Sequence, residues 1–130
     1  MRQLMALGLL VMSWAIAPTA EVFVLSTGNA SVDAAIQTAL INGGHTVNFG
    51  PTLQTFDGTI PPTTQVVYIP AEPNWSGDMP AAAQTALVNW LNAGAGRGLI
   101  TTEWVIWMNG VGRFRTLGTV FPADYAGSYR

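Results

Sequence analysis

The feature that most constrains the fold is the stretch 98–107, in which a short apolar run gives way to two threonines, a carboxylate and two indoles. A short apolar run bounded by glycine after a helical pattern is typical of a strand buried on both faces, as in a parallel sheet. Ligands of open parallel sheets bind outside the carboxyl ends of the strands. We therefore expect Thr101 to Trp107 to stand at the rim of any binding site.

The composition indicates one compact domain and narrows the class of protein. The chain has 130 residues and a net charge of -2, with 49% hydrophobic and 9% charged residues, which excludes a disordered chain. It has no lysine and its arginines are scattered, so no basic stripe exists for a nucleic acid. It also has no cysteine, which excludes disulfides and a cysteine nucleophile.

Residues 1–20 have the pattern of a secretory signal peptide. A charged start precedes an apolar run over residues 4–17 and a small-residue end at residues 18–20. The apolar run is shorter than the ~20 residues that a membrane-spanning helix needs. We therefore expect a mature chain that starts near Glu21, is periplasmic or extracellular, and has no stable membrane span after signal cleavage.

Strand and helix patterns alternate along the rest of the chain. Apolar runs rich in strand-forming residues predict strands over residues 21–25, 46–49 and 65–69 and from residue 98. Residues 50–62 predict a long irregular connection. Asp78 is expected to cap a helix that Gly94-Ala95-Gly96 ends. Ser31 is expected to cap an earlier amphipathic helix that has Asp33 in its first turn. The apolar stripe of this helix consists of Val32, Ala35, Ile36, Ala39 and Leu40.

Helices between nearly all the strands imply parallel pairing with right-handed crossovers. The predicted fold is thus a three-layer, doubly wound, flavodoxin-like α/β domain with a mostly parallel sheet over residues 21–130. A further short helix is indicated around residues 114–121, and no fifth strand follows. The fourth strand would then have an unpaired edge, so we expect a C-terminally incomplete fragment of a longer domain. The hydrophobic residues expected to lack a cover are Val105, Ile106, Trp107, Phe114 and Phe121.

The loop Ser26, Thr27, Gly28 and Asn29 is one candidate for ligand binding. It follows the first predicted strand and opens the first helix, where backbone N–H groups and the helix dipole favour an anion. It resembles the flavodoxin loop that holds the flavin mononucleotide phosphate, although Leu25 and Ala30 stand where hydroxyl residues are expected. A plain turn followed by a helix cap is the other interpretation.

The other candidates lie after the third and fourth strands. They are Glu72, Asn74 and Trp75 in one loop, and Thr102 and Trp104 in the other. Tryptophans beside polar residues at a rim suit stacking on sugars, although tryptophan is most often part of a core.

Glu103 is the candidate catalytic residue and has two interpretations. It is either a solvated carboxylate at a strand end or a carboxylate desolvated among Trp75, Trp104 and Trp107. In the second case its raised pKa would suit acid–base work. His45, the single histidine, is expected at the entry of the second strand, away from the rim. No Ser-His-Asp triad, metal site or cofactor is therefore expected.

Four segments together resemble the class I glutamine amidotransferase-like superfamily, especially its trehalose-utilisation-protein-like branch. They are residues 21–25, 44–47, 65–69 and 98–104. In catalytic members, the strand that matches Leu99 to Thr101 leads into a sharp turn holding a cysteine nucleophile, which a later histidine serves. Here the turn reads Thr102-Glu103-Trp104 and no histidine follows. The resemblance implies the fold and argues against amidotransferase or protease chemistry.

Three functions are compatible with these patterns. The first is an exported, non-catalytic domain that binds a small polar ligand, a glycan or another domain of a longer chain at the rim. The second is a hydrolase that uses Glu103 as general acid or base, with Glu72 as a partner. The third is a flavodoxin-like carrier with its flavin phosphate on residues 26–29.

Overall fold

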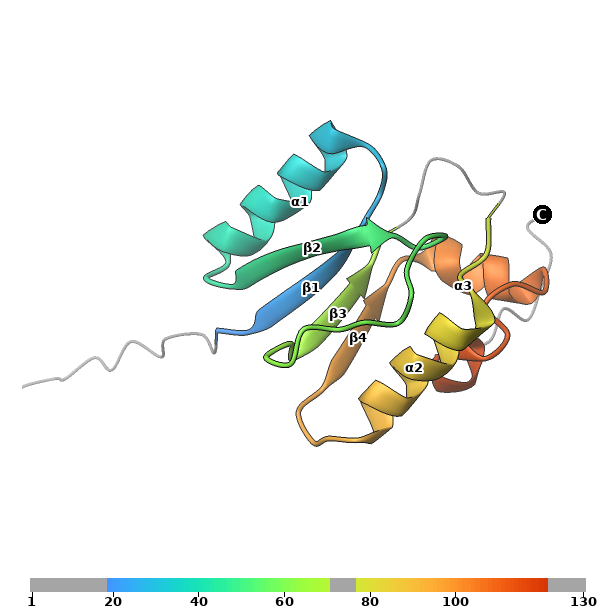
Figure 1. Ribbon diagram of the computed structural model, residues 1–130. Coiled ribbons are helices and arrows are strands. Elements are labelled where there is room, and N and C mark those ends of the chain that lie inside the picture. Colours follow the sequence, from blue (N-terminus) through green and yellow to red (C-terminus); the bar gives the residue numbers. More distant parts are fainter. Residues whose placement is uncertain (1–18, 71–76, 122–130) are drawn as a thin grey trace, which may run out of the picture.

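The described part of the chain forms a parallel sheet with helices on both faces (Figure 1). The computed structural model describes residues 19–70 and 77–121. The strands are β1 (Glu21–Ser26), β2 (Thr46–Thr52), β3 (Val66–Ile69) and β4 (Gly98–Thr101). The helices are α1 (Ala30–Asn42), α2 (Ala81–Asn92), α3 (Glu103–Gly110) and the short 3-10 helix η1 (Leu117–Val120). This arrangement confirms the predicted three-layer α/β class.

The strand order β2-β1-β3-β4 defines where the chain changes direction across the sheet. All three neighbouring pairs are parallel, so the carboxyl ends of the four strands lie at the same end of the sheet. The chain steps from β1 to β2 on one side and from β3 to β4 on the other. Right-handed crossovers therefore place α1 and α2 on opposite faces. In such a sheet the binding crevice is expected between the carboxyl ends of β1 and β3.

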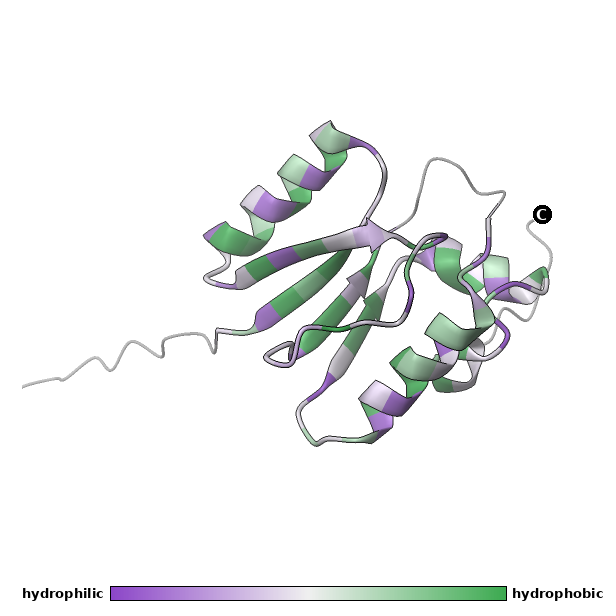
Figure 2. Ribbon diagram, in the orientation of Figure 1, coloured by the Kyte–Doolittle hydropathy of each residue, from purple (hydrophilic) through white to green (hydrophobic). Residues whose placement is uncertain are grey.

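The main core lies between the sheet and α2. Alternate side chains of the two central strands point to this face and are buried against α2 and the segment after α3. Figure 2 shows how hydrophobic residues concentrate along these strands. The central members of this core are Phe23, Leu25, Val67, Ile69, Ala83 and Leu87.

The face under α1 is covered less completely. Val22 and Val24 of β1 are buried there, but α1 itself contains no buried residue, and Val32 is 42% exposed. The predicted helix is present, but its apolar stripe is only partly covered, with Ile36 and Leu40 half-buried. The cover is partial because α1 contacts β2, an edge strand with exposed positions, and does not extend over the outer part of β3 and β4.

β2 is longer than predicted because it pairs with β1 as far as Thr52. Gly50 and Pro51, which predicted an irregular connection, are part of this strand. Pro51 is tolerated because β2 is an edge strand. Gly50 is required because a Cβ there would collide with the ring of Phe23.

Both predicted helix caps are wrong. α1 is capped by Asn29, whose side-chain oxygen accepts hydrogen bonds from the N–H groups of Ser31 (3.1 Å) and Val32 (3.4 Å). Asp78 does not cap α2, which begins after Pro80 without a side-chain cap. Its carboxylate accepts a hydrogen bond from the Phe114 N–H (3.0 Å) instead, so it serves a tertiary contact.

The chain after β4 closes over the α2 face. α3 begins two residues after β4, and η1 confirms the predicted short helix. Val105 and Phe114 are buried, so the prediction that they lack a cover is wrong. Ile106, Trp107 and Phe121 are half-buried. No fifth strand occurs among the residues that the structure describes.

A buried glutamine on α2 joins this segment to the core. Gln84 is only 4% exposed. Its side-chain oxygen accepts hydrogen bonds from the N–H groups of Thr116 (3.1 Å) and Leu117 (3.2 Å). Its nitrogen donates to the Met79 carbonyl (2.8 Å) and to the Asp78 carboxylate (3.3 Å). Both donors and both acceptor positions of the amide are thus used.

We predict that Gln84→Leu lowers the free energy of unfolding by about 2–4 kcal/mol, because backbone groups of residues 79, 116 and 117 lose their partner. Urea denaturation followed by circular dichroism measures the change. Gln37→Leu, the same substitution at an exposed position of α1, is the matched control and should change stability by no more than about 0.5 kcal/mol. Equal effects of the two variants would show that the Gln84 hydrogen bonds contribute nothing to stability.

Candidate functional site

The candidate site lies at the end of the sheet where the strands have their carboxyl ends. Residues 26–29 follow β1 and residues 102–104 follow β4, so parallel pairing brings both segments to this end of the sheet. β3 lies between β1 and β4, however, and separates the two segments. Glu72, Asn74 and Trp75, in the loop after β3, lie outside the described residues.

The loop after β1 is organised around a carboxylate of its own chain. The Asp33 side chain accepts hydrogen bonds from the Ser26 hydroxyl (2.6 Å), the Thr27 hydroxyl (2.7 Å) and the Thr27 N–H (2.9 Å). Gly28 has a φ of 75°, which lets the chain turn tightly before Asn29 caps α1. These contacts have the form of a turn followed by a helix cap.

Asp33 occupies the position that an anion would take in this loop. The donors that would hold a phosphate, the Thr27 N–H and the two hydroxyl groups, already bind its carboxylate. Burial raises the pKa of Asp33, but the hydrogen bonds from Ser26 and Thr27 outweigh this effect and hold the pKa below its usual value. A phosphate would have to displace an ionised group, so the geometry does not favour the flavin hypothesis.

The segment after β4 turns sharply into α3. Thr102 is the N-cap residue of this helix but makes no side-chain cap hydrogen bond. Its hydroxyl oxygen is buried and makes no hydrogen bond with any residue in the described ranges. Among the described residues the buried Thr102 hydroxyl thus has no hydrogen-bond partner, and leaving such a group unpaired costs about 1–3 kcal/mol.

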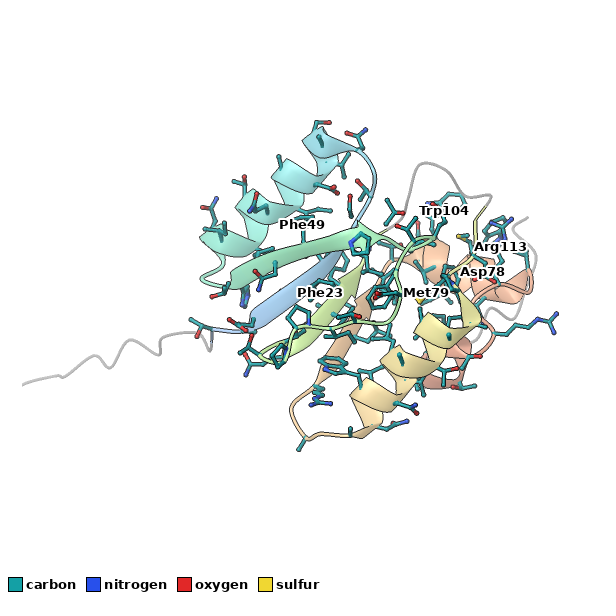
Figure 3. The ribbon with its side chains drawn as sticks, viewed as in Figure 1. Phe23, Phe49, Asp78, Met79, Trp104 and Arg113 are labelled. Atoms are coloured by element: carbon teal, nitrogen blue, oxygen red, sulfur yellow. The ribbon has the colours of Figure 1, made fainter. Side chains whose placement is uncertain are left out.

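Glu103 and Trp104 are the exposed part of this segment. Glu103 lies in the first turn of α3, where a carboxylate complements the helix dipole, and its side chain is exposed. Trp104, labelled in Figure 3, is 44% exposed. Its ring meets the ring of Trp107 edge-on, with 5.4 Å between the centroids. Exposure fits the interpretation of Glu103 as a solvated carboxylate. Its proposed partner Glu72 lies outside the described residues.

The single histidine lies at the other end of the sheet. His45 directly precedes β2, and its Nδ1 accepts a hydrogen bond from the Ala20 N–H (3.3 Å). Within residues 19–70 and 77–121 no cluster of His, Cys, Asp and Glu side chains could hold a metal ion. The helices described there include none that is long and apolar enough to cross a membrane.

Sequence reasoning missed the role of Asp33. The sequence places Asp33 only in the first turn of a predicted helix, whereas in the structure its carboxylate holds the preceding loop. The signal that could have revealed this role is the pair of hydroxyl residues before Gly28, which need an acceptor once the loop folds back on the helix.

Comparisons with known proteins add no relative to this description. No family model matches the chain, and neither the curated proteins nor the solved structures contain a match. The resemblance to the amidotransferase-like superfamily therefore stays a prediction.

We predict that Asp33→Asn lowers the free energy of unfolding at pH 7 by about 1–3 kcal/mol, because charged hydrogen bonds to Ser26 and Thr27 are lost. The pKa of Asp33 is lowered by folding, so its contribution is present above the usual carboxyl value of 3.8 and is lost as the pH falls through the folded-state pKa. The difference between wild type and variant should accordingly shrink below about pH 4.

Urea denaturation at a series of pH values measures this difference. Asp57→Asn is the control, because the Asp57 carboxylate is fully exposed and accepts its hydrogen bond from the nearby Thr59 N–H. Its effect should be smaller than that of Asp33→Asn. A difference between wild type and Asp33→Asn that stays constant from pH 7 to pH 3 would contradict the assigned role of this carboxylate.

Proposed function

We propose that the protein is an exported, non-catalytic domain that binds a glycan at the rim after β4. The observation that carries this proposal is the exposed indole of Trp104 next to the exposed carboxylate of Glu103. Of the three ligand classes expected from the sequence, which were small polar molecules, glycans and partner domains, this pair of groups favours a glycan.

An exposed indole and a carboxylate have complementary uses on a sugar. The indole face stacks on the apolar C–H face of a pyranose ring, and a carboxylate accepts hydrogen bonds from its hydroxyl groups. The edge contact with Trp107 restricts the orientation of the Trp104 ring. A restricted aromatic side chain loses little conformational entropy on binding, which favours affinity.

We propose a non-catalytic role because of two residue types, cysteine and histidine, that common hydrolases use for catalysis. The chain has no cysteine, and its one histidine lies at the amino-terminal end of the sheet. Glu103 is exposed to solvent, whereas a carboxylic acid used for acid–base catalysis usually lies in a site shielded from solvent.

The test is a panel of soluble oligosaccharides titrated into the protein in a calorimeter. We expect Trp104→Ala to weaken the binding of the best oligosaccharide about tenfold or more, equivalent to ~1.4 kcal/mol. Val111→Ala, which truncates another exposed side chain just after α3, is the control and should bind as wild type does. If Trp104→Ala binds as tightly as wild type, the proposed site is wrong.

The same oligosaccharides should be recovered intact after incubation with the protein. Cleavage that falls about 10²–10⁴-fold in Glu103→Gln would replace the binding hypothesis with the hydrolase hypothesis. If no oligosaccharide binds, the glycan proposal fails, and small anions or a partner domain become the ligands to test at this rim.

A further inference from the structure

The outer edge of β4 is open among the residues that the structure describes. β4 is last in the strand order and pairs only with β3 there. Proteins usually protect an edge strand with a charged side chain, a proline or a bulge. The sequence of β4, Gly98–Thr101, contains no charged residue and no proline, and its pairing with β3 is regular. The edge is therefore suited to accept another strand.

The hydrogen bonds between β4 and the β3 side show which backbone groups of β4 face outward. The Gly98 N–H donates to the carbonyl oxygen of Gln65 (2.9 Å), so the backbone groups of Gly98 face β3. Successive residues of a strand direct these groups to opposite sides, and Ile100 therefore faces β3 as well. The N–H and C=O groups of Leu99 and Thr101 consequently point outward.

These outward groups are arranged symmetrically about Ile100. We propose that β4 pairs with β4 of a second copy of the chain, antiparallel and around a two-fold axis at Ile100. In this register Leu99 of each copy exchanges both N–H···O hydrogen bonds with Thr101 of the other. Every outward group of the strand finds a partner, so the edge is complementary to itself.

Ile100 provides the apolar contact at the axis. Its side chain is 51% exposed and lies beside Tyr68, on the part of the sheet that α1 leaves uncovered. At the axis it faces its own symmetry copy as a non-hydrogen-bonded pair, with Cα atoms about 4.5 Å apart. Pairing thus removes from water an apolar side chain that is exposed in the single chain.

The charges at the two ends of β4 favour the antiparallel orientation. Arg97 directly precedes the strand and Glu103 follows it after one residue. Antiparallel pairing brings the Arg97 end of one strand to the Glu103 end of the other, at both ends of the interface. Parallel pairing would place like charges together, which is unfavourable.

The two-fold arrangement also limits the assembly. The same surface is used by both copies, so the contact closes on itself and gives a dimer instead of a fibre. A strand of this length spans roughly 13 Å. We expect an interface at the small end of specific contacts, below about 1,200 Å², and hence a dimer that dissociates on dilution.

Sedimentation equilibrium of the whole chain over a range of concentrations tests the proposal. For wild type the weight-average mass should rise from that of one chain to that of two. Ile100→Lys places two like charges at the axis and should remain monomeric throughout. Val32→Lys is the control, because Val32 is similarly exposed but lies on α1, and it should dimerise as wild type does.

The chain has no cysteine, so single-cysteine variants can test the register of the two strands. This test is informative even if the Ile100→Lys variant fails to fold. Under mild oxidation Ile100→Cys should form an intermolecular disulfide, since Cα atoms about 4.5 Å apart can be bridged. We expect this to proceed at least tenfold faster than in Leu99→Cys, which faces Thr101 of the other copy, or in Val32→Cys.

Three results would overturn the proposal. They are a wild-type mass of one chain at all concentrations, a dimer that folded Ile100→Lys leaves intact, and equal cross-linking rates for Ile100→Cys and Val32→Cys.

Discussion

The structure depends on one buried amide. Gln84 projects from α2 and is fully hydrogen-bonded to the segment before its own helix and to the segment after α3. The amide binds the N–H groups of Thr116 and Leu117, which closely follow Phe114. Phe114 is buried in the core and has a φ of 50°, an uncommon conformation for a bulky residue. Asn109 supports the same segment by donating to the carbonyl oxygens of Arg113 and Phe114. α3 and η1 are therefore held against α2 by polar contacts as well as by apolar packing, which together position the rim after β4.

The central part of the fold was predictable because its residues leave little choice. Val22 to Leu25 and Val67 to Ile69 form apolar runs typical of strands inside a parallel sheet, and the helical patterns between the strands favour parallel crossovers. The periphery was harder to predict. Gly50 and Pro51 disfavour a strand by local propensity, yet pairing with β1 and the ring of Phe23 overrides this preference. The stripe on α1 has helical periodicity, but periodicity does not reveal how far a helix extends over the sheet.

The candidate site was predictable in location but not in its contacts. The order of the elements places residues 26–29 and 102–104 at the carboxyl ends of strands, and the structure has them there. Asp33 accepts hydrogen bonds from the loop after β1 because the first turn of α1 brings its carboxylate back to that loop. The sequence pattern alone does not show this proximity. The exposure of Trp104 depends likewise on which side of α3 packs on the core, and the apolar character of residues 104–108 left that side undetermined.

The weak cover on one face has a consequence for how the protein opens. α1 contributes no buried residue and is joined to the rest mainly by its contacts with β2 and by the hydrogen bonds of Asp33 with Ser26 and Thr27. Local unfolding is cheapest where little apolar surface is buried. Amide protons of α1 should thus exchange through local openings while those of α2 exchange only when the whole domain unfolds. We therefore expect the two helix layers to be cooperative units of unequal stability, although they cover the two faces of one sheet.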